Sequence, residues 1–295
     1  MIKITNNSNL PESLVRFTES NRHFSGGAGF SVTELLDSPQ IRSLKKIHAE
    51  DLSEDVSDSV MSIIGTAVHE VLSRYCDVGS IPETRLFANV SGETISGQID
   101  LLEKSNPVYE GFIVVDYKTT SAATITYNPE GKKEWEQQLN LYAFLAEENG
   151  IKVSGLDAVV IIRDWSKKHY KERANYPSSP ILRIPMPFWT KSEALDFIKS
   201  RIELHKLEPV PECTDEDRWA RPSKYAVYGK PHSWRKPRAK RVFNTKAEAE
   251  EYEILLDSSD TRIEERTSGL VRCENNYCGV AKFCNQFKEA LNWDS

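Results

Sequence analysis

Apolar residues recur with two different periods along the middle of the chain. From Ser59 to Tyr75 they return every three or four positions, which predicts an amphipathic helix. Strand-like runs of apolar and β-branched residues follow at Thr84 to Val90, Thr94 to Glu103 and Phe112 to Lys118. The third run is almost continuously apolar, as expected for a central strand that is buried on both faces.

The alternation continues toward the C-terminus. The pattern predicts an amphipathic helix from Trp135 to Glu148, a central strand from Leu156 to Asp164, a further strand from Ile181 to Pro187 and a helix from Lys191 to Lys206. Before Ser59, a short helical stretch covers residues 31–50, whereas residues 1–30 have no strong period. The order of helix, three strands, helix and strand predicts a mixed α/β core.

The composition changes after Leu207. Prolines 209 and 211 precede a basic, aromatic segment, a Glu-rich helix is predicted from Thr245 to Leu256, and three cysteines lie near the end. We therefore expect three parts: an N-terminal helical lead-in (1–58), a core (59–206) and an extension (207–295). No internal repeat or long low-complexity tract is present in the sequence.

Overall composition excludes several classes of protein. With 39% hydrophobic and 28% charged residues among 295, the chain is expected to fold rather than remain disordered. Its apolar runs are too short to cross a bilayer and its first residues lack an apolar signal core, so a cytoplasmic protein without a membrane partner is expected. The net charge of −6 argues against nucleic-acid attraction over the whole surface but permits a local basic patch.

Candidate chemistry begins at the end of the third strand run. Asp116 and Lys118 are two residues apart, so their side chains point to the same side of a strand. Taken alone, this pair fits a surface salt bridge equally well. Asp100 lies in the preceding strand run, and two carboxylates on adjacent strands repel each other unless a cation lies between them. Mg²⁺ or Mn²⁺, which prefer oxygen ligands, would resolve that conflict.

A histidine on the preceding helix adds to this set. His69 follows Gly65 by one helical turn on the same face, and Gly65 is expected to permit close packing of the helix. A single helical histidine is more often structural than a ligand. Its position just before the two acidic strands makes a ligand role the stronger hypothesis.

These residues together resemble the RecB branch of the PD-(D/E)XK nuclease superfamily. The resemblance rests on Gly65-Thr66 with His69, Glu83, Gly97-Gln98-Ile99-Asp100, Asp116-Tyr117-Lys118, and Gln138 with Tyr142, in that order. It covers residues 31–165 and resumes at the terminal cysteines. It implies a restriction-endonuclease-like core, that is, a mixed β-sheet flanked by helices, here with a C-terminal cysteine-cluster extension.

The resemblance also implies roles for individual residues. Asp100 and Asp116 would bind the metal, with the backbone carbonyl of Tyr117 and with His69. Lys118 would orient or deprotonate the attacking water and stabilise charge on the phosphate. Three further residues would lie at the site: Glu83 in a less defined role, and Gln138 and Tyr142 on one helical face turned toward the substrate. For Tyr142, simple core packing is the alternative.

The cysteines fit the same family in part. The chain has five, an odd number without an export signal, which does not suit a disulfide framework. In RecB-like CRISPR-associated exonucleases and AddB-type nuclease domains, four cysteines hold a 4Fe–4S cluster. Cys273, Cys278 and Cys284 match the trailing three, although the first spacing is longer than usual. The fourth ligand is expected to be Cys213, with Cys76 as the alternative, and Zn²⁺ is the alternative to the cluster.

A basic segment precedes these cysteines. Residues 230–241 carry no acidic side chain, and the cations expected to bind nucleic acid are Arg235, Lys236, Arg238, Lys240 and Arg241. Aromatic residues interleave with them, at positions 219, 225, 228 and 234. Cations that follow phosphates and aromatics that stack on bases suit single-stranded nucleic acid. A solvated loop that balances acidic surface is the alternative.

The sequence as a whole predicts a metal-dependent DNA nuclease. By resemblance, it would act as an exonuclease on DNA ends or single strands, in recombination, repair or phage DNA processing, with a recombination or helicase partner. The alternatives are a catalytically inactive DNA- or partner-binding module on the same fold, and an RNase. No phosphate-binding loop of the Gly-x-x-x-x-Gly-Lys-Ser/Thr type is present, so ATP-driven movement along DNA is not expected.

Overall fold

The computed structural model describes residues 2–20, 25–105, 110–229, 238–256, 260–266 and 269–293. The chain divides into two compact units. The first contains Met1–Arg42 and Ala49–Pro211, and the second contains Ser43–His48 and Glu212–Ser295.

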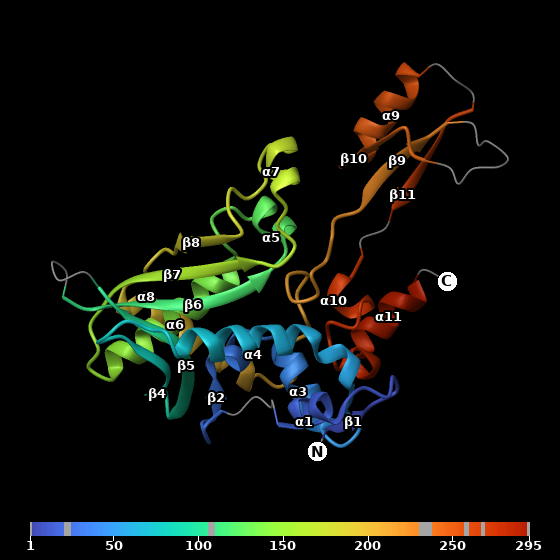
Figure 1. Cartoon of the computed structure of the whole chain (residues 1–295). Coiled ribbons are helices and arrows are strands. Elements are labelled where there is room, and N and C mark those ends of the chain that lie inside the picture. Colours follow the sequence, from blue (N-terminus) through green and yellow to red (C-terminus); the bar gives the residue numbers. More distant parts are fainter. Residues whose placement is uncertain are drawn as a thin grey trace. The chain divides into compact units, whose positions relative to one another are not determined.

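A mixed six-stranded sheet forms the centre of the first unit (Figure 1). Its strands are β2 (Phe30–Ser31), β4 (Ile81–Val90), β5 (Glu93–Lys104), β6 (Phe112–Thr120), β7 (Val153–Ile162) and β8 (Ile181–Pro185). They are ordered β2-β5-β6-β7-β8, and β4 pairs with β5 outside that path. The mixed α/β core predicted from the sequence is therefore confirmed, although β4 and β7 each begin three residues earlier than expected.

Strand directions follow from the connections. β4, β5 and β6 form an antiparallel meander, whereas β6 and β7 are parallel. A parallel pair needs a crossover, and helix α6 (Lys133–Glu148) supplies it. The almost continuous apolar run in β6 is explained by this central position, where Val114 and Val115 are fully buried.

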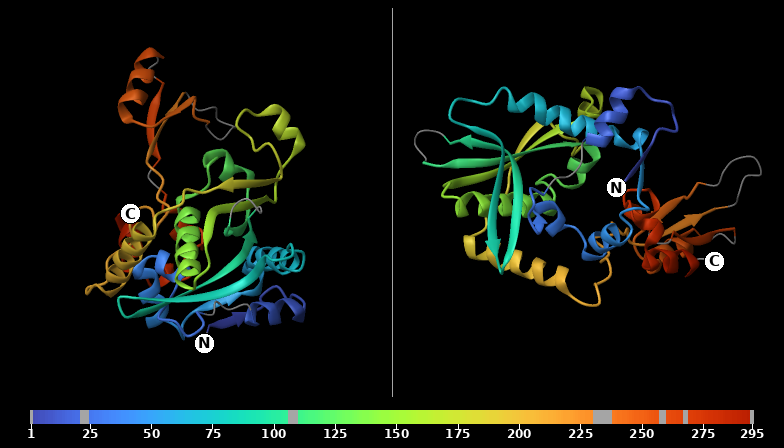
Figure 2. Two further views of the ribbon diagram at one scale, coloured as in Figure 1. Left: turned by 90° about the vertical axis from the view of Figure 1, so that its left-hand side faces the viewer. Right: turned by 90° about the horizontal axis from the view of Figure 1, so that it is seen from below.

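One face of the sheet is covered by helices α6 and α8 (Lys191–Lys206), which lie side by side in Figure 2. Leu139, Leu145 and Ile198 on these helices are completely buried in the core. The short helix α2 (Val32–Leu36) is fixed to α8 through its last carbonyls: Arg201 donates to the carbonyls of residues 35, 36 and 37, and His205 Nε2 lies 3.1 Å from that of residue 35. These contacts satisfy acceptors that a helix end leaves unpaired.

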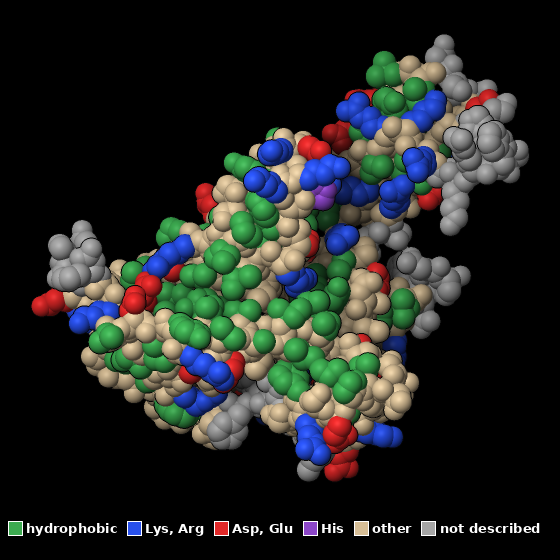
Figure 3. Space-filling model, viewed as in Figure 1, with side chains coloured by type: hydrophobic (Ala, Val, Ile, Leu, Met, Phe, Trp, Pro, Cys, Tyr) green, Lys and Arg blue, Asp and Glu red, His purple; other side chains and the backbone are tan. Residues whose placement is uncertain are grey.

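Helix α4 (Val60–Ser73) lies on the opposite face of the sheet, as both views in Figure 2 show. The predicted helix is confirmed, but none of its side chains is buried, and Val60, Met61 and Val71 are about half exposed. Figure 3 shows hydrophobic side chains along it. Close packing at Gly65 was expected and is wrong, because a Cβ there would meet no heavy atom within 4 Å in the described part of the structure.

The predicted helical stretch over residues 31–50 is interrupted. Helix α2 ends at Leu36 and helix α3 (Pro39–Ile47) begins two residues after Asp37. A proline restricts the residue before it to extended backbone and is well suited to the first turn of a new helix, which explains the break.

Smaller elements complete the first unit. These are β1 (Lys3–Thr5), which pairs in parallel with β3 (Ser53–Asp55), helices α1 (Glu12–Ser20), α5 (Ala122–Tyr127) and α7 (Lys167–Glu172), and the 3-10 turn Val56–Ser59. Helix α1 lies in the N-terminal region for which the sequence showed no strong period.

The second unit contains a sheet that the sequence pattern did not predict. Strands β9 (Lys224–Tyr228), β10 (Arg241–Phe243) and β11 (Arg262–Arg266) form an antiparallel sheet, with β9 in the middle, and helix α9 (Lys246–Leu255) packs on it. The cysteine region consists of α10 (Val271–Glu274), the 3-10 turn Ala281–Phe283 and α11 (Asn285–Trp293). Within the described ranges of both units, no helix combines the length and apolar character that a membrane span requires.

Candidate active site

The site forms where strands β5 and β6 separate. Their antiparallel ladder runs as far as Leu101 opposite Val115, so Asp100 and Asp116 are the next residues in the same register. There the backbone ladder ends, and Asp100 Oδ2 instead accepts a hydrogen bond from the Tyr117 amide at 2.8 Å. Both carboxylates are buried, at 6% and 2% exposure. Two buried acidic groups at one opening of the sheet need positive partners.

His69 of α4 is one such partner. Its Nδ1 lies 3.2 Å from Asp100 Oδ1 and 3.7 Å from Glu83 Oε1, and its Nε2 lies 3.3 Å from the Tyr117 carbonyl oxygen. Glu83 reaches this point because the register of β4 on β5 pairs its neighbours, Pro82 with Leu101 and Thr84 with Ile99, and so brings Glu83 level with Asp100. Its backbone adopts a left-handed φ of 47° there. Asp100 first, and then Glu83, raise the pKa of His69 to about 10.

This group fits a divalent cation. One ligand atom each from His69, Glu83 and Asp100 can be chosen so that all lie within 4.8 Å of one another, and within the described ranges no other set of three such side chains does the same. Two carboxylates and the Tyr117 carbonyl supply the oxygen ligands that Mg²⁺ and Mn²⁺ prefer. Next to this group lies a second buried carboxylate, Asp116, whose Oδ2 faces the Lys118 ammonium. Its negative charge adds to that of Asp100 and Glu83, and a divalent cation would offset it.

Asp116 and Lys118 form the second half of the site. Their side chains share one side of β6, as the alternation in a strand requires, and Lys118 Nζ lies 2.6 Å from Asp116 Oδ2. Burial, opposed by the Lys118 charge, raises the pKa of Asp116 to about 6. The ammonium also donates to Gln138 Oε1 at 2.7 Å, and Gln138 Nε2 donates to Tyr142 Oη at 2.8 Å. Gln138 and Tyr142 therefore belong to the same hydrogen-bonded row as the lysine.

The structure thus sorts the predicted site residues into two neighbouring groups. His69, Glu83, Asp100 and the Tyr117 carbonyl surround one point, while Asp116 pairs with Lys118. The sequence expected Asp116 among the metal ligands and gave Glu83 no defined role, and the assignment of ligands stays a prediction. Tyr142 is packed in the core, at 5% exposure, and its hydroxyl is also hydrogen-bonded to Gln138. Core packing and a place at the active site are therefore compatible for this residue.

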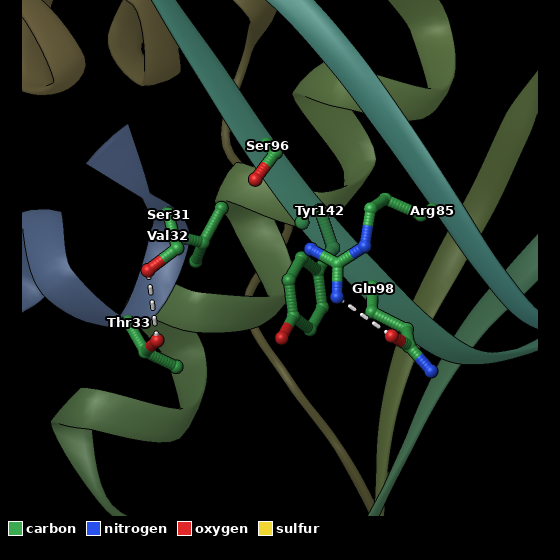
Figure 4. A pocket seen from close by; sticks show the side chains of 8 residues that line it. Ser31, Val32, Thr33, Arg85, Ser96, Gln98 and Tyr142 are labelled. Carbon is green, nitrogen blue, oxygen red and sulfur yellow. Dashed lines mark hydrogen bonds between the residues drawn. The ribbon is translucent and has the colours of Figure 1, made fainter. Parts of the chain in front are cut away.

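Two residues without a role in the sequence-based prediction extend the site. Gln98 Nε2 donates to Glu83 Oε2 at 2.7 Å, and Arg85 Nη2 donates to Gln98 Oε1 at 2.7 Å (Figure 4). Arg85 lies directly opposite Gln98 in the β4–β5 ladder. Only this strand register identifies Arg85 as a residue of the site, and the register cannot be read from the sequence because it is set when the two strands pair.

The cysteines are distributed between the units. Cys76 belongs to the first unit and lies near Tyr117. The pKa of the Tyr117 phenol is raised by burial first, and then by the charges of Asp100, Glu103 and Cys76. The other four belong to the second unit. There, burial and then the neighbouring Cys278 and Cys284 raise the pKa of the Cys273 thiol. The side-chain amide of Gln286, two residues after Cys284, accepts from the Cys213 backbone N–H at 3.2 Å and donates to the Cys213 carbonyl at 2.9 Å.

No set of three cysteines in the described ranges is placed as ligands of one metal ion. Zinc–sulfur bonds of about 2.3 Å would bring thiolates within about 4 Å of one another. Each thiolate of a 4Fe–4S cluster binds a different iron, so the sulfur atoms lie farther apart.

The basic segment is only partly described. Arg235 and Lys236 lie outside the described residues, whereas Arg238, Lys240 and Arg241 lie within them. Arg241 stacks on the Phe243 and Tyr252 rings, at 5.1 and 5.6 Å from their centres. On the same small sheet, the guanidinium groups of residues 262 and 266 lie over the ring of residue 228, at 5.0 and 6.0 Å. Cations and aromatic rings are therefore combined on this sheet.

Comparison with known proteins agrees with the site. The family model of the PD-(D/E)XK nuclease superfamily matches residues 81–285, which is more than half of the chain. No curated protein matches the sequence. Among solved structures, the chain is similar to the crystal structure of SSO0001, with 16% sequence identity, a TM-score of 0.43 and coverage of 65% of this chain and 82% of that one. That likeness is too weak to support a conclusion about activity.

The family match, by contrast, extends over the greater part of the chain. It includes Asp100, Asp116 and Lys118 as well as the terminal cysteines, and the mixed sheet with flanking helices agrees with the restriction-endonuclease-like fold. The chain therefore belongs to the PD-(D/E)XK nuclease superfamily.

Proposed function

We propose that the chain is a Mg²⁺- or Mn²⁺-dependent deoxyribonuclease of the RecB-like branch. The observation that carries the proposal is the pair of groups at the opening between β5 and β6. A set that could hold a cation, His69, Glu83 and Asp100, lies next to the pair formed by the buried Asp116 and the partly buried Lys118. Phosphodiester hydrolysis needs both: a divalent ion, and a positive side chain where charge develops on the phosphate.

In this proposal the ion is held by His69, Glu83, Asp100 and the Tyr117 carbonyl, with Asp116 as a further ligand. When bound, it supplies a water of lowered pKa and neutralises charge on the phosphate oxygens. Lys118 orients the water and stabilises the negative charge that develops on the phosphate. Asp116 and Gln138 hold the lysine ammonium from two sides, so it is already oriented when the substrate arrives.

A cleavage assay on labelled DNA, with and without Mg²⁺ or Mn²⁺, tests the proposal. Asp116→Asn keeps the size of the side chain but removes a ligand charge, so both metal affinity and cleavage should fall. Lys118→Ala should reduce cleavage by about two orders of magnitude or more while metal binding remains. Near-wild-type cleavage by either folded variant would refute the assignment. An absence of cleavage by the wild-type protein would favour an inactive binding module, and faster cleavage of RNA would favour an RNase.

We further propose exonuclease action on DNA ends or single strands, in recombination, repair or phage DNA processing inside the cell, with a recombination or helicase partner. The support for this mode is the resemblance of the motifs. Linear and covalently closed circular single strands of one sequence distinguish the modes: an exonuclease degrades only the linear form. Labels at the 5′ and 3′ ends then give the polarity.

The four cysteines of the second unit are proposed to hold a 4Fe–4S cluster. The Cys278 and Cys284 thiols act on the pKa of Cys273, and Cys213 is hydrogen-bonded to Gln286, two residues after Cys284, which supports Cys213 rather than Cys76 as the fourth ligand. Anaerobically purified protein should contain about four irons per chain and absorb visible light. Cys213→Ala should remove the colour and Cys76→Ala should not. One zinc without iron would support the alternative, and the absence of both metals would refute a metal-binding role for these cysteines.

The small sheet of the second unit and its basic segment are proposed to bind single-stranded DNA. Replacing Arg235, Lys236, Arg238 and Arg241 by neutral residues should weaken DNA binding and flatten its dependence on salt, since fewer counterions are released. If the slope of log affinity against log salt does not change, the segment is a surface loop.

A further inference from the structure

The connection between β7 and β8 in the first unit is strongly basic. It contains helix α7, and over residues 163–173 five side chains are basic and two are acidic, whereas the whole chain has a net charge of −6. Figure 3 shows several Lys and Arg side chains over α7. All five basic side chains are exposed, and together they are called the α7 surface below: Arg163, Lys167, Lys168, Lys171 and Arg173.

These charges are not neutralised by neighbouring carboxylates. Among the described residues, none of the five cations forms an ion pair with an acidic side chain, and Arg173 instead lies 3.4 Å from His169 Nε2. Lys167 and Lys171 are four residues apart on one helical face, a spacing at which like charges destabilise a helix. The first turn of α7 carries two lysines and no acidic residue, although the helix dipole favours the reverse. The charges therefore do not stabilise the helix itself, and an anionic ligand would offset their repulsion.

The connection is held in a compact conformation by its aromatic side chains. Trp165 Nε1 donates to the carbonyl of Pro177 at 2.8 Å, and the Tyr176 hydroxyl accepts from the Ser166 backbone N–H at 3.0 Å. These bonds join the two ends of the segment that contains α7. The cations are thus carried on a support that is already folded, so little ordering is required when a ligand binds.

The same connection begins next to the catalytic strand. β7 runs parallel to β6, and Thr120, two residues after Lys118, pairs with Ile162 at the end of β7. The Arg163 backbone N–H then donates to the Thr120 carbonyl at 3.0 Å. At roughly 3.3 Å per residue, the connection starts about 7 Å along the sheet from Lys118. Figure 1 shows α7 beyond this end of β6 and β7, so a strand that is bound at the lysine and continues past the end of the sheet reaches it.

An aromatic ring lies among the lysines of α7. The Tyr170 side chain is 47% exposed, and its ring is tilted by 31° against that of Trp165, with the ring centres 6.3 Å apart. Cations that follow phosphates, together with an exposed ring on which a base can stack, suit single-stranded nucleic acid. A duplex would satisfy the cations but offers no unpaired base to the ring.

We propose that the α7 surface, together with Tyr170, binds single-stranded DNA beyond the phosphodiester that is cut. The inference rests on the proposed nuclease function and specifies its substrate as a strand with an unpaired segment that reaches from Lys118 to α7. None of these residues belongs to the motifs that identified the family.

The test replaces Lys167, Lys168 and Lys171 together by glutamine. Binding of a labelled single-stranded oligonucleotide is measured by fluorescence anisotropy over a range of salt concentrations, with Ca²⁺ in place of Mg²⁺ so that affinity is measured separately from cleavage. The slope of log affinity against log salt should decrease by about 2, since each phosphate contact on a single strand contributes about 0.7. At about 0.1 M salt, binding should weaken about ten- to a hundredfold.

A matched control removes the same total charge elsewhere in the first unit. Lys152, Lys191 and Lys206 are exposed lysines that each pair with a carboxylate, and their joint replacement by glutamine should leave affinity and slope close to wild type. Tyr170→Leu separates stacking from charge. It should weaken single-strand binding by about fivefold or more without changing the salt slope, and should leave duplex binding unchanged.

Wild-type affinity and slope in the α7 lysine variant, or an equal loss in the control variant, overturn the inference. Wild-type single-strand affinity in Tyr170→Leu overturns the assignment of a single strand. If the variants bind in the expected pattern but the wild-type protein cleaves no DNA with Mg²⁺ or Mn²⁺, the α7 surface stands and the proposed nuclease activity fails. If the wild type cleaves DNA and the α7 lysine variant does so with unchanged KM, the activity stands and the α7 surface fails.

Discussion

Replacing Gln138 tests whether the lysine at the active site is held in place from outside the metal group. Among the described residues, Lys118 Nζ has two partners, Asp116 Oδ2 at 2.6 Å and Gln138 Oε1 at 2.7 Å, and its side chain is 21% exposed. Gln138→Leu removes the second partner and preserves the approximate size of the side chain. The ammonium then has one partner that fixes its direction instead of two.

The expected cost follows from the kind of bond that is lost. A hydrogen bond to a charged group contributes about 1.5–3 kcal/mol, and each 1.36 kcal/mol corresponds to a factor of ten in rate. We therefore expect kcat for DNA cleavage to fall by about ten- to a hundredfold. KM should change by less, because Gln138 contacts the lysine and Tyr142 rather than the substrate in this proposal.

Steady-state kinetics with Mg²⁺ on a linear single strand provide the measurement. Gln137→Leu is the matched control, since it makes the same substitution at the preceding position of α6 and should keep wild-type kcat. Gln138→Glu retains an oxygen for Lys118, and the Tyr142 hydroxyl can turn to donate to it. This variant should therefore keep more activity than Gln138→Leu. If Gln138→Leu keeps kcat within about twofold of wild type while Lys118→Ala is inactive, Gln138 does not position the lysine.

Three further predictions concern packing, pH and metal. Gly97→Ala should lower the free energy of unfolding by about 1–3 kcal/mol, because its Cβ would meet the Tyr142 ring. Gly65→Ala is the control and should be neutral or stabilising, because a Cβ there has space. Equal effects of the two substitutions in denaturant melts would contradict the packing described for Gly97. Burial lowers the pKa of His205, so the folded protein binds fewer protons than the unfolded chain below about pH 6.5, and acid should reduce stability. His205→Gln should reduce the slope of unfolding free energy against pH between about pH 7 and about pH 5, and an unchanged slope would exclude this residue as its source. Removing divalent ions with a chelator should abolish cleavage, and added Mg²⁺ or Mn²⁺ should restore it only while Asp100 is intact, as an Asp100→Asn titration would show.

Much of this protein could be predicted from the sequence because the signals are local. Helices and strands follow from apolar periods of 3.6 and 2, which need only neighbouring residues, and every predicted strand of the first unit is present. Placing Asp116 and Lys118 on one side of β6 is the same kind of inference. Strands of three to five residues are too short to show a clear period, so the small sheet of the second unit was missed.

Only the tertiary structure determined which side chains contact one another at the active site. Glu83 joins His69 and Asp100 because the β4–β5 register brings it level with Asp100, and Arg85 reaches Gln98 for the same reason. The apolar pattern of α4 predicted a helix but could not show that its outer face stays exposed, because burial depends on what packs there from elsewhere in the chain. Local sequence fixes which conformation a segment prefers and which side chains share a face. The contacts of those faces form between residues distant in sequence, and only the folded chain determines them.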